Sequence, residues 1–432
     1  MNSPVNASVE HTLLAVLIQL TVIIAAARAA GALFRRMGQP RVCGEIAAGL
    51  ILGPSLFGGL FPSLFAQVFT IAVSPIFSVM SQIGLVLLMF LIGLEFDFGH
   101  LDDNRRTALS VSVVGIVLPF ALGMLLGRFL HGALGLPGNW INFGIFMAAA
   151  MSITAIPILG RIMIELNINR TRIGSLTISA AAIDDAAGWI ILALATAIVR
   201  STFDPVKFTL MIVEVIAFAA VMIFLVRPLV IRALRRTGSE LSLDGLAALL
   251  IVMLLCAMVT NLIGIFSIFG AFFFGAILYD QHELAASVRR RLHDFVTVFF
   301  LPIFFTYTGL RTDIGTMTEP RMWFYCGLVL LAAVAGKFGG CALAARWNGL
   351  PWRESGIIGV MMNTRALMEL IVVNIGYDLG IIPKSVFFML VFMAVATTYI
   401  TTPLLRRLIR KSEIEAEYLN SDFVRSTPAA RG

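Results

Sequence analysis

Apolar runs of about 20 residues recur along this sequence and constrain its fold more than any other feature. A helix of that length spans a hydrocarbon core of about 30 Å. Of the 432 residues, 13% are charged, whereas a typical soluble domain has about 25%. The runs are too long, and alternate too little, for the strands of a membrane barrel. We therefore expect an all-helical, polytopic membrane protein.

The hydropathy pattern predicts thirteen transmembrane helices. Their expected bounds are 12–34, 41–60, 76–97, 106–130, 139–165, 172–199, 206–234, 242–262, 264–280, 293–311, 321–346, 352–379 and 383–408. We expect one transmembrane domain over residues 1–411, followed by a short cytoplasmic tail over 412–432.

Lysine and arginine residues are distributed unevenly between alternate loops. If the N-terminus lies outside, the cytoplasmic loops hold twenty-one of them and the opposite loops hold six. Cytoplasmic loops carry such an excess, so we expect the N-terminus outside and the C-terminus in the cytoplasm. The net charge of +7 then reflects topology, and no nucleic-acid partner is expected because the arginines are dispersed over many loops.

Two pairs of short segments indicate an internal repeat. The segment GEIAAGLIL at 44–52 resembles GAFFFGAIL at 270–278, and GLEFD at 93–97 resembles GLRTD at 309–313. Glycine-rich helix ends can also look alike by chance, so the matches alone leave both interpretations open.

The order of these matches predicts two six-helix repeats, at 12–199 and 242–408, joined by a connector helix at 206–234. Six helices and one connector make an odd number, so the second copy enters the membrane from the opposite side. Inverted repeats of this kind form many secondary transporters, whose substrate site lies near mid-membrane.

Ionisable side chains within an apolar span cost about 2.5 to 3.5 kcal/mol each on insertion scales and are functional candidates by default. The candidates here are Glu45, Asp184, Asp185, Glu214, Lys337, Arg365 and Glu369. Asp184 and Asp185 lie near mid-depth, and helical neighbours point about 100° apart, so they cannot both face one partner. Lys337, the only lysine within a predicted span, needs a counter-charge, and one of these aspartates is the simplest partner.

Two predicted spans are interrupted. The fifth contains MSITAIPILGR, where Pro157 removes a backbone donor and Ser152 and Thr154 supply hydroxyls. The twelfth contains MMNTRALMEL, which places polar residues inside an apolar run: Asn363, Thr364 and Arg365. Broken helices at equivalent positions indicate a transporter site, because unwound carbonyls and helix ends can coordinate an ion. A simple kink at Pro157 is the alternative.

Arg365 and Glu369 are spaced four residues apart and can bridge each other on one helix face. Structural pairing is favoured over ion contact for Arg365, whereas both roles stay open for Glu369. Glu45 and Glu214 have no evident partner and are expected outside the site.

Nothing in the sequence supports an enzyme. The five histidines lie at or beyond the predicted helix ends, without metal-ligand spacing. No nucleotide-binding or hydrolase motif occurs in the structural context that its chemistry requires. The four cysteines are expected to be small packing residues. We expect no catalytic residues and no cofactor.

Several segments resemble motifs of the monovalent cation:proton antiporter family 2, which includes bacterial sodium/proton and potassium/proton exchangers. They are GQPRVCGEIAAGLILGPSLFG (38–58), GLVLLMFLIGLEFD (84–97), MSITAIPILGRIM (151–163), AAAIDDAAGW (180–189) and MMNTRALMELIVVNIG (361–376). The resemblance implies a homodimer in a bacterial-type plasma membrane, with a dimerisation domain and a moving core domain in each protomer. It also implies two crossed broken helices in the core, here the fifth and twelfth spans.

The same resemblance implies roles for individual residues. Asp185 would bind the cation, Asp184 would pair with Lys337, and Thr154 would line the site. Ala366 stands where a glycine is common in the family. The sequence ends at residue 432, so we do not expect the nucleotide-binding domain of the glutathione-gated potassium members.

Taken with the resemblance, these features predict an electrogenic antiporter that exchanges Na⁺ for protons by alternating access. The cation and the protons would compete for Asp184 and Asp185. Exchange of K⁺ for protons stays open, because similar residues flank these motifs in potassium-type members. An ion channel or a sensor on the same fold is a more remote alternative, which uphill cation flux driven by a pH gradient would exclude.

Overall fold

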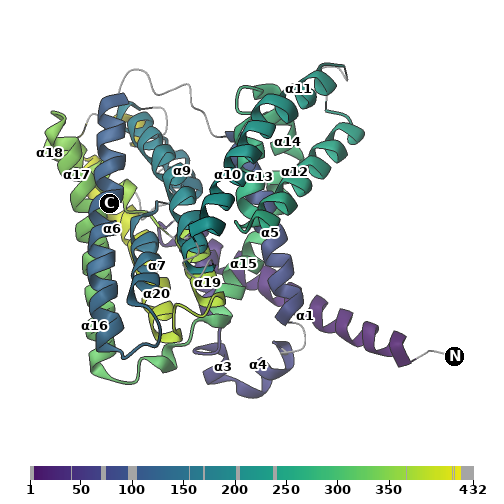
Figure 1. Cartoon of the computed structure of the whole chain (residues 1–432). Coiled ribbons are helices and arrows are strands. Elements are labelled where there is room, and N and C mark those ends of the chain that lie inside the picture. The colour runs from purple at the N-terminus through teal and green to yellow at the C-terminus, as the bar shows by residue number, and fades with distance from the viewer. Residues whose placement is uncertain are drawn as a thin grey trace. The chain divides into compact units, whose positions relative to one another are not determined.

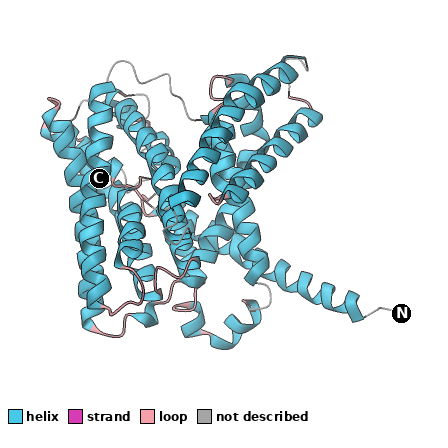
Figure 2. Cartoon of the chain, viewed as in Figure 1, coloured by secondary structure: helices cyan, strands magenta, loops and turns pink. Residues whose placement is uncertain are grey.

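The structure is a computed structural model that describes residues 4–39, 41–69, 74–95, 105–154, 156–168, 171–200, 205–236, 241–365, 367–410, 412 and 414–419. Helices and connecting loops make up all of this described part (Figure 2). Ala366, Asp97 and most of the predicted tail at 412–432 lie outside the described residues.

The helices fall into two compact units (Figure 1). The first unit comprises Met1–Thr70, His100–Leu192 and Phe305–Gly432. Its helices are α1 (Pro4–Arg36), α2 (Arg41–Ile51), α3 (Phe57–Leu60), α4 (Pro62–Val68), α6 (Arg105–Ala133), α7 (Trp140–Ser152), α8 (Ile156–Glu165), most of α9 (Arg172–Arg200), the end of α15 (Leu301–Arg311), η5 (Ile314–Thr316), α16 (Pro320–Val334), η6 (Ala335–Gly339), α17 (Gly340–Trp347), α18 (Trp352–Met362), α19 (Leu367–Asp378), α20 (Lys384–Ile409) and α21 (Glu415–Leu419).

The second unit comprises Ile71–Gly99 and Ala193–Phe304. Its helices are α5 (Ser74–Glu95), the end of α9, α10 (Pro205–Val221), η3 (Met222–Val226), α11 (Arg227–Arg236), α12 (Leu243–Ile263), α13 (Ser267–Ala276), α14 (His282–Phe295), η4 (Val296–Phe300) and the start of α15.

Nine helices in the described part of the chain are long and apolar enough to cross a membrane, and the bent pair α18–α19 would make ten. They are α1, α5, α6, α9, α12, α20 and the composite helices Thr209–Ala233, His282–Thr316 and Pro320–Trp347. The predicted spans 41–60, 139–165 and 264–280 fall on shorter helices: α2 with α3, α7 with α8, and α13. The prediction of an all-helical polytopic protein is confirmed, and the count of thirteen stays a prediction.

Several helices begin and end at residues suited to those positions. The side chain of Asn139 accepts a hydrogen bond from the Ile141 amide at 2.9 Å and caps α7. Ser242 caps α12 in the same way through the Gly245 amide, as short polar side chains do at helix N-termini. Gly264 ends α12 with φ at 97°, a left-handed conformation that favours glycine.

Both interrupted spans are broken helices in the interior of the first unit. Helix α7 ends at Ser152 and α8 begins at Ile156, with Ile153 extended between them. Pro157 is the second residue of α8, where its missing N–H costs no helical hydrogen bond, so it opens the second half-helix instead of kinking a continuous one. Helices α18 and α19 meet at 41°, and α19 is buried from Leu367 to Gly376.

A π-helical turn, η6, interrupts the long helix that joins α16 to α17. It contains Lys337 and packs against α6 and α18. A side chain added at Gly336 would lie 2.9 Å from Pro119 of α6, so glycine allows this close approach. Such turns are rare and occur often at functional sites.

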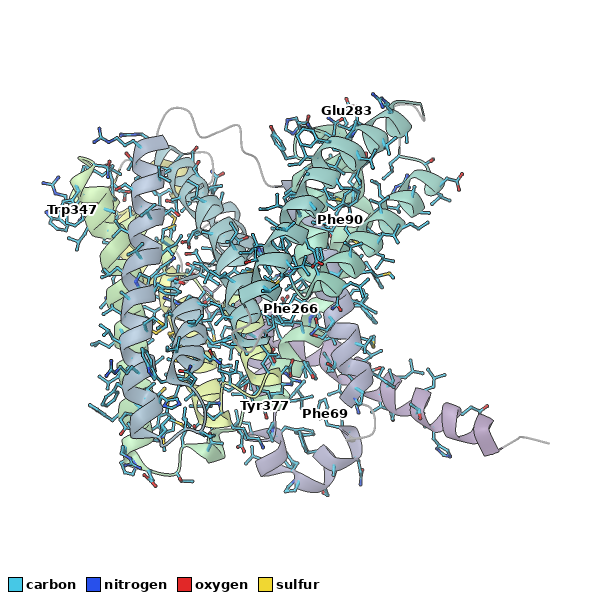
Figure 3. All side chains as sticks on the ribbon, viewed as in Figure 1. Phe69, Phe90, Phe266, Glu283, Trp347 and Tyr377 are labelled. Atoms are coloured by element: carbon cyan, nitrogen blue, oxygen red, sulfur yellow. The ribbon has the colours of Figure 1, made fainter. Side chains whose placement is uncertain are left out.

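Glycines also form one helix crossing within each unit. In the first unit the backbones of Gly49 on α2 and Gly309 on α15 lie against each other, and a Cβ at either would clash with the opposite helix. In the second unit Gly93 on α5 and Gly275 on α13 do the same. Phe90 of α5, labelled in Figure 3, stacks on Phe274 of α13 beside that crossing, with ring centroids 5.4 Å apart.

Candidate functional site

Asp184 and Asp185 lie midway along α9, among alanines that keep this part of the helix narrow. Both side chains are essentially without solvent exposure, at 0% and 1%. As consecutive residues of a helix they point in different directions. Two buried carboxyl groups therefore face different partners, as the sequence predicts.

Lys337 is the direct partner of Asp184. Its Nζ lies 2.6 Å from Asp184 Oδ2, and neither side chain has any exposed surface. The same Nζ donates to the backbone carbonyl of Ser152, at the end of α7. Lys337 thus joins the carboxylate helix to the first broken helix, and a short charge-assisted contact of this kind is among the stronger hydrogen bonds in proteins.

Thr154 connects the two helix breaks. Its Oγ1 donates to the Met362 carbonyl, the last of α18, at 2.8 Å. Thr154 also interacts with Asp184 through its hydroxyl and its amide. The neighbouring Ser152 hydroxyl turns back to the Ala149 carbonyl at 3.1 Å, so Ser152 reaches the site through its carbonyl oxygen.

Arg365 lies fully buried at the second break and binds the end of the first broken helix. Its guanidinium donates to the carbonyl of Ala150 at 3.0 Å, to that of Met151 at 2.7 Å, and more weakly to that of Ala333 on α16 at 3.4 Å. Two positive charges, those of Arg365 and Lys337, therefore lie at the C-terminal end of α7, where the helix dipole is negative.

These contacts change one expectation from the sequence. We expected unwound carbonyls at the breaks to coordinate an ion, yet the carbonyls of Ala150, Met151, Ser152 and Met362 all accept hydrogen bonds from side chains. In this conformation the protein's own donors occupy them. Side-chain oxygens without a hydrogen bond among the described residues include Oδ1 of Asp185, Oδ1 of Asn363 and both carboxyl oxygens of Glu369.

Asp185 offers such an oxygen. Its Oδ1 is buried and has no hydrogen-bond partner among the described residues. Trp189, one helical turn further on, interacts with the same carboxyl group. A buried carboxylate without a full set of partners is costly, so Asp185 is suited to bind a cation or a proton.

The remaining predicted site residues lie around the second break. Asn363 is largely buried, and no group in the described part of the chain binds its Oδ1. The Thr364 hydroxyl lies 3.3 Å from that of Thr401 on α20. Glu369 follows on α19 and forms the predicted ion pair with Arg365, with Oε2 3.8 Å from Nη1, a separation longer than a hydrogen bond.

Two further acidic candidates lie on helices other than the broken ones and α9. Glu45 is buried on α2, and Glu214 is exposed on α10 of the second unit.

Sequence reasoning missed a second polar cluster in the first unit, around Arg311 at the end of α15. Arg311 pairs with Asp378 at 2.7 Å and donates to Asn374 Oδ1 at 3.1 Å. Its guanidinium also lies over the rings of Tyr307 and of Tyr377, which Figure 3 labels, 4.2 and 5.4 Å from the centroids. In the sequence Arg311 is one of several arginines at the ends of predicted spans, and no local pattern identifies its partners.

The charges of the cluster indicate what it can bind. Five fully buried ionisable side chains gather at the two breaks: Asp184, Asp185, Lys337, Arg365 and Glu369. Three acids and two bases leave one net negative charge in their ordinary states. One monovalent cation or one proton would neutralise it. Broken helices around such a cluster in a polytopic helical protein define a secondary transporter.

Comparison with known proteins identifies the family. Residues 20–411 match the family model described as "Sodium/hydrogen exchanger, transmembrane". The chain therefore belongs to the sodium/hydrogen exchanger family and is a cation/proton antiporter, not an enzyme.

Individual relatives agree with this assignment. The chain is 40% identical to the Na⁺/H⁺ antiporter NhaS4 of Synechocystis sp., over 92% of this chain and 98% of that protein. It is 30% identical to the Na⁺/H⁺-K⁺ antiporter GerN of Bacillus cereus, over 90% of this chain and 95% of that protein. It also spans 50% of the length of Arabidopsis thaliana relatives that it matches at 32 to 35% identity.

Among solved structures, the sodium proton antiporter MjNhaP1 of Methanocaldococcus jannaschii is similar. The TM-score is 0.58 at 14% identity, over 95% of this chain and 99% of that chain. At this identity the likeness shows a shared fold.

Proposed function

We propose that the protein exchanges Na⁺ for protons at Asp185, while Asp184 is held by Lys337. The observation that carries the proposal is the unequal partnering of two adjacent buried carboxyl groups. Asp184 has a lysine at 2.6 Å, whereas Asp185 Oδ1 has no hydrogen-bond partner among the described residues. Asp185 is therefore free to alternate between a cation and a proton.

Competition at one carboxyl group couples the two fluxes. A proton on Asp185 removes the charge that holds the cation, and loss of the proton restores it. Moving the bare, charged site through a low-dielectric region is costly, so the core would reorient with either a cation or a proton bound. Each turn of the cycle then exchanges one species for the other.

Several residues would support this site without necessarily contacting the ion. Thr154 ties the two breaks together and lies beside Asp184. Arg365 closes the end of α7. The remaining supporting residues are Ser152, Pro157, Asn363, Thr364 and Glu369.

The choice of Na⁺ rests on the relative NhaS4, which is named for Na⁺ and H⁺. Exchange of K⁺ for protons is the second candidate, because GerN, with similar coverage, is named for both Na⁺ and K⁺.

We also propose thirteen membrane spans in two inverted repeats, with residues 1–411 as the transmembrane domain. The glycine crossings support this arrangement. Gly49 and Gly275 occupy equivalent positions in the two matched segments, as do Gly93 and Gly309. Gly49 lies against Gly309, and Gly275 lies against Gly93, so the second helix of each repeat crosses the third helix of the other in the same way.

The remaining features of the proposal concern assembly and placement. We propose a homodimer in a bacterial-type plasma membrane, with the N-terminus outside and the C-terminus in the cytoplasm. The excess of arginine in alternate loops supports this orientation, and the family resemblance supports the dimer. Crosslinking in the membrane and labelling of single cysteines at loop positions would test both.

Purified protein in liposomes provides the test of function. An imposed pH gradient should drive Na⁺ uphill, and the wild-type protein should also be assayed with Li⁺ and K⁺. Asp185→Asn should abolish exchange, because the amide can neither bind a proton nor supply a charge. Full activity of that variant would refute the assignment of Asp185. If the wild-type protein carried Na⁺ only down its gradient, the protein would be a channel.

A further inference from the structure

Glu369 is a second buried carboxyl group in the first unit, and it can accept a proton without the loss of a hydrogen bond. We propose that it binds a second proton in each cycle, so that two protons are exchanged for one cation. This inference rests on the proposed function, in which Asp185 binds the cation and the first proton.

The surroundings of Glu369 carry the argument. Its side chain is 1% exposed, and neither carboxyl oxygen accepts a hydrogen bond from any described residue. The nearest cation is that of Arg365, whose Nη1 lies 3.8 Å from Oε2, beyond hydrogen-bond length. A buried carboxylate without donors is poorly compensated, so a proton added there costs no existing hydrogen bond.

Arg365 cannot easily move its terminal nitrogens closer to Glu369, because Nη1 and Nη2 already donate hydrogen bonds, and only Nε has no partner among the described residues. The terminal nitrogens bind the carbonyls of Ala150 and Met151 on α7 and, more weakly, that of Ala333 on α16. Turning the guanidinium toward Glu369 would leave buried carbonyls unpaired, which costs about 1 to 3 kcal/mol for each such group. The hydrogen bonds of Arg365 at the helix break therefore maintain its separation from Glu369.

Asp184 is a less suitable acceptor for the second proton. Its Oδ2 already binds Lys337 at 2.6 Å. Protonating Asp184 would break up this hydrogen-bonded ion pair, which is strongly unfavourable, whereas the ion pair of Glu369 with Arg365 is longer, at 3.8 Å, and Arg365 keeps its carbonyl acceptors when Glu369 is protonated. Other charged or titratable groups acting on this part of the core are Cys341 on α17 and Asp184 itself, both of which interact with Arg365.

The charge count gives the proposal a measurable consequence. With all five groups in their ordinary states the cluster carries one net negative charge. One bound cation makes it neutral, whereas protons on both Asp185 and Glu369 make it positive by one. A full cycle then moves one net charge across the membrane. If Glu369 bound no proton, both loaded forms would be neutral and exchange would be electroneutral.

The ratio of protons to cations at zero net flux tests this directly. Liposomes containing wild-type protein, Glu369→Gln or the control Glu214→Gln would be held at zero membrane potential, with equal K⁺ on both sides and valinomycin. The control changes an exposed acid on α10 of the second unit. A tenfold proton gradient should hold about a hundredfold Na⁺ gradient in the wild type and the control, and about a tenfold gradient in Glu369→Gln.

Every outcome bears on the proposal. A tenfold Na⁺ gradient in the wild type overturns it even if Glu369→Gln fails to fold. A hundredfold gradient that persists in Glu369→Gln also overturns it. If the ratio falls to one in Lys337→Gln but not in Glu369→Gln, the second proton belongs to the lysine. Asp185→Asn, measured beside them, separates this result from the proposed function: exchange that survives in Asp185→Asn refutes the function itself.

Discussion

The buried pair of Lys337 and Asp184 provides the clearest quantitative prediction. Lys337→Met keeps most of the apolar stem but removes the ammonium group. The loss leaves Asp184 Oδ2 without its partner at 2.6 Å and the Ser152 carbonyl without its donor. The cost should therefore come from an uncompensated buried charge and not from a cavity.

The expected magnitude follows from this geometry. Removing one partner of a buried ion pair costs about 3 to 5 kcal/mol. Asp184→Asn should cost a similar amount, because it leaves a buried ammonium without its counter-charge. The double variant Lys337→Met/Asp184→Asn contains neither charge, so it should lose about 1 to 3 kcal/mol less than the sum of the two single losses, the range seen for directly coupled residues.

Unfolding by sodium dodecyl sulfate in mixed micelles would measure these free energies for the wild type and the three variants. The matched control is Lys384→Met at the start of α20, outside the cluster, which should change the free energy of unfolding by less than about 0.5 kcal/mol. Losses that add in the double variant would refute a direct interaction between Lys337 and Asp184.

Further predictions concern the glycine crossings and the polar contacts. Gly309→Ala should lower the yield of folded protein, because the new Cβ would clash with the Gly49 backbone. The control Gly327→Ala should be tolerated, because nothing lies within 4 Å of a Cβ at that position. Equal yields of the two variants would contradict the crossing. Thr154→Val should cost about 1 to 3 kcal/mol of unfolding free energy through the unpaired carbonyl at the second break and should slow exchange; an unchanged rate would place Thr154 outside the site. Arg311→Gln should lower the free energy of unfolding by less than about 1 kcal/mol, because its ion pair with Asp378 is partly exposed. A loss comparable to that of Lys337→Met would contradict this small contribution to stability.

Much of the central cluster could be predicted from sequence because charge is rare in this chain. An aspartate pair and a single mid-span lysine are conspicuous in an apolar sequence, and the cost of burying charge leaves few ways to arrange them. The structure places Lys337 beside Asp184. It also breaks the helices near Thr154 and Arg365, where polar residues interrupt the apolar runs.

The contacts of Arg365 could not be predicted in the same way. From spacing alone we favoured a bridge to Glu369, because residues four apart face each other on a helix. The structure contains this pair as an ion pair at 3.8 Å, but the hydrogen bonds of the guanidinium go to carbonyls of α7 and α16. Every residue has a backbone carbonyl, so a sequence does not indicate which carbonyls a distant side chain will bind. Long-range contacts of this kind are found only in a structure.

The glycine crossings show a similar limit. The sequence predicted that Gly49 and Gly275 correspond, and likewise Gly93 and Gly309. It did not predict which helices they would contact. Glycine marks a place where a backbone can approach closely, but the identity of the approaching helix depends on the tertiary arrangement.

Proton release on cation binding tests the central claim most directly. Purified protein in weakly buffered detergent solution would be mixed with Na⁺ near neutral pH while a pH-sensitive dye reports released protons. The wild type should release protons, whereas Asp185→Asn should neither bind Na⁺ in calorimetry nor release protons. Saturable Na⁺ binding with unchanged proton release in Asp185→Asn would contradict competition at this carboxyl group and, with it, the proposed exchange mechanism.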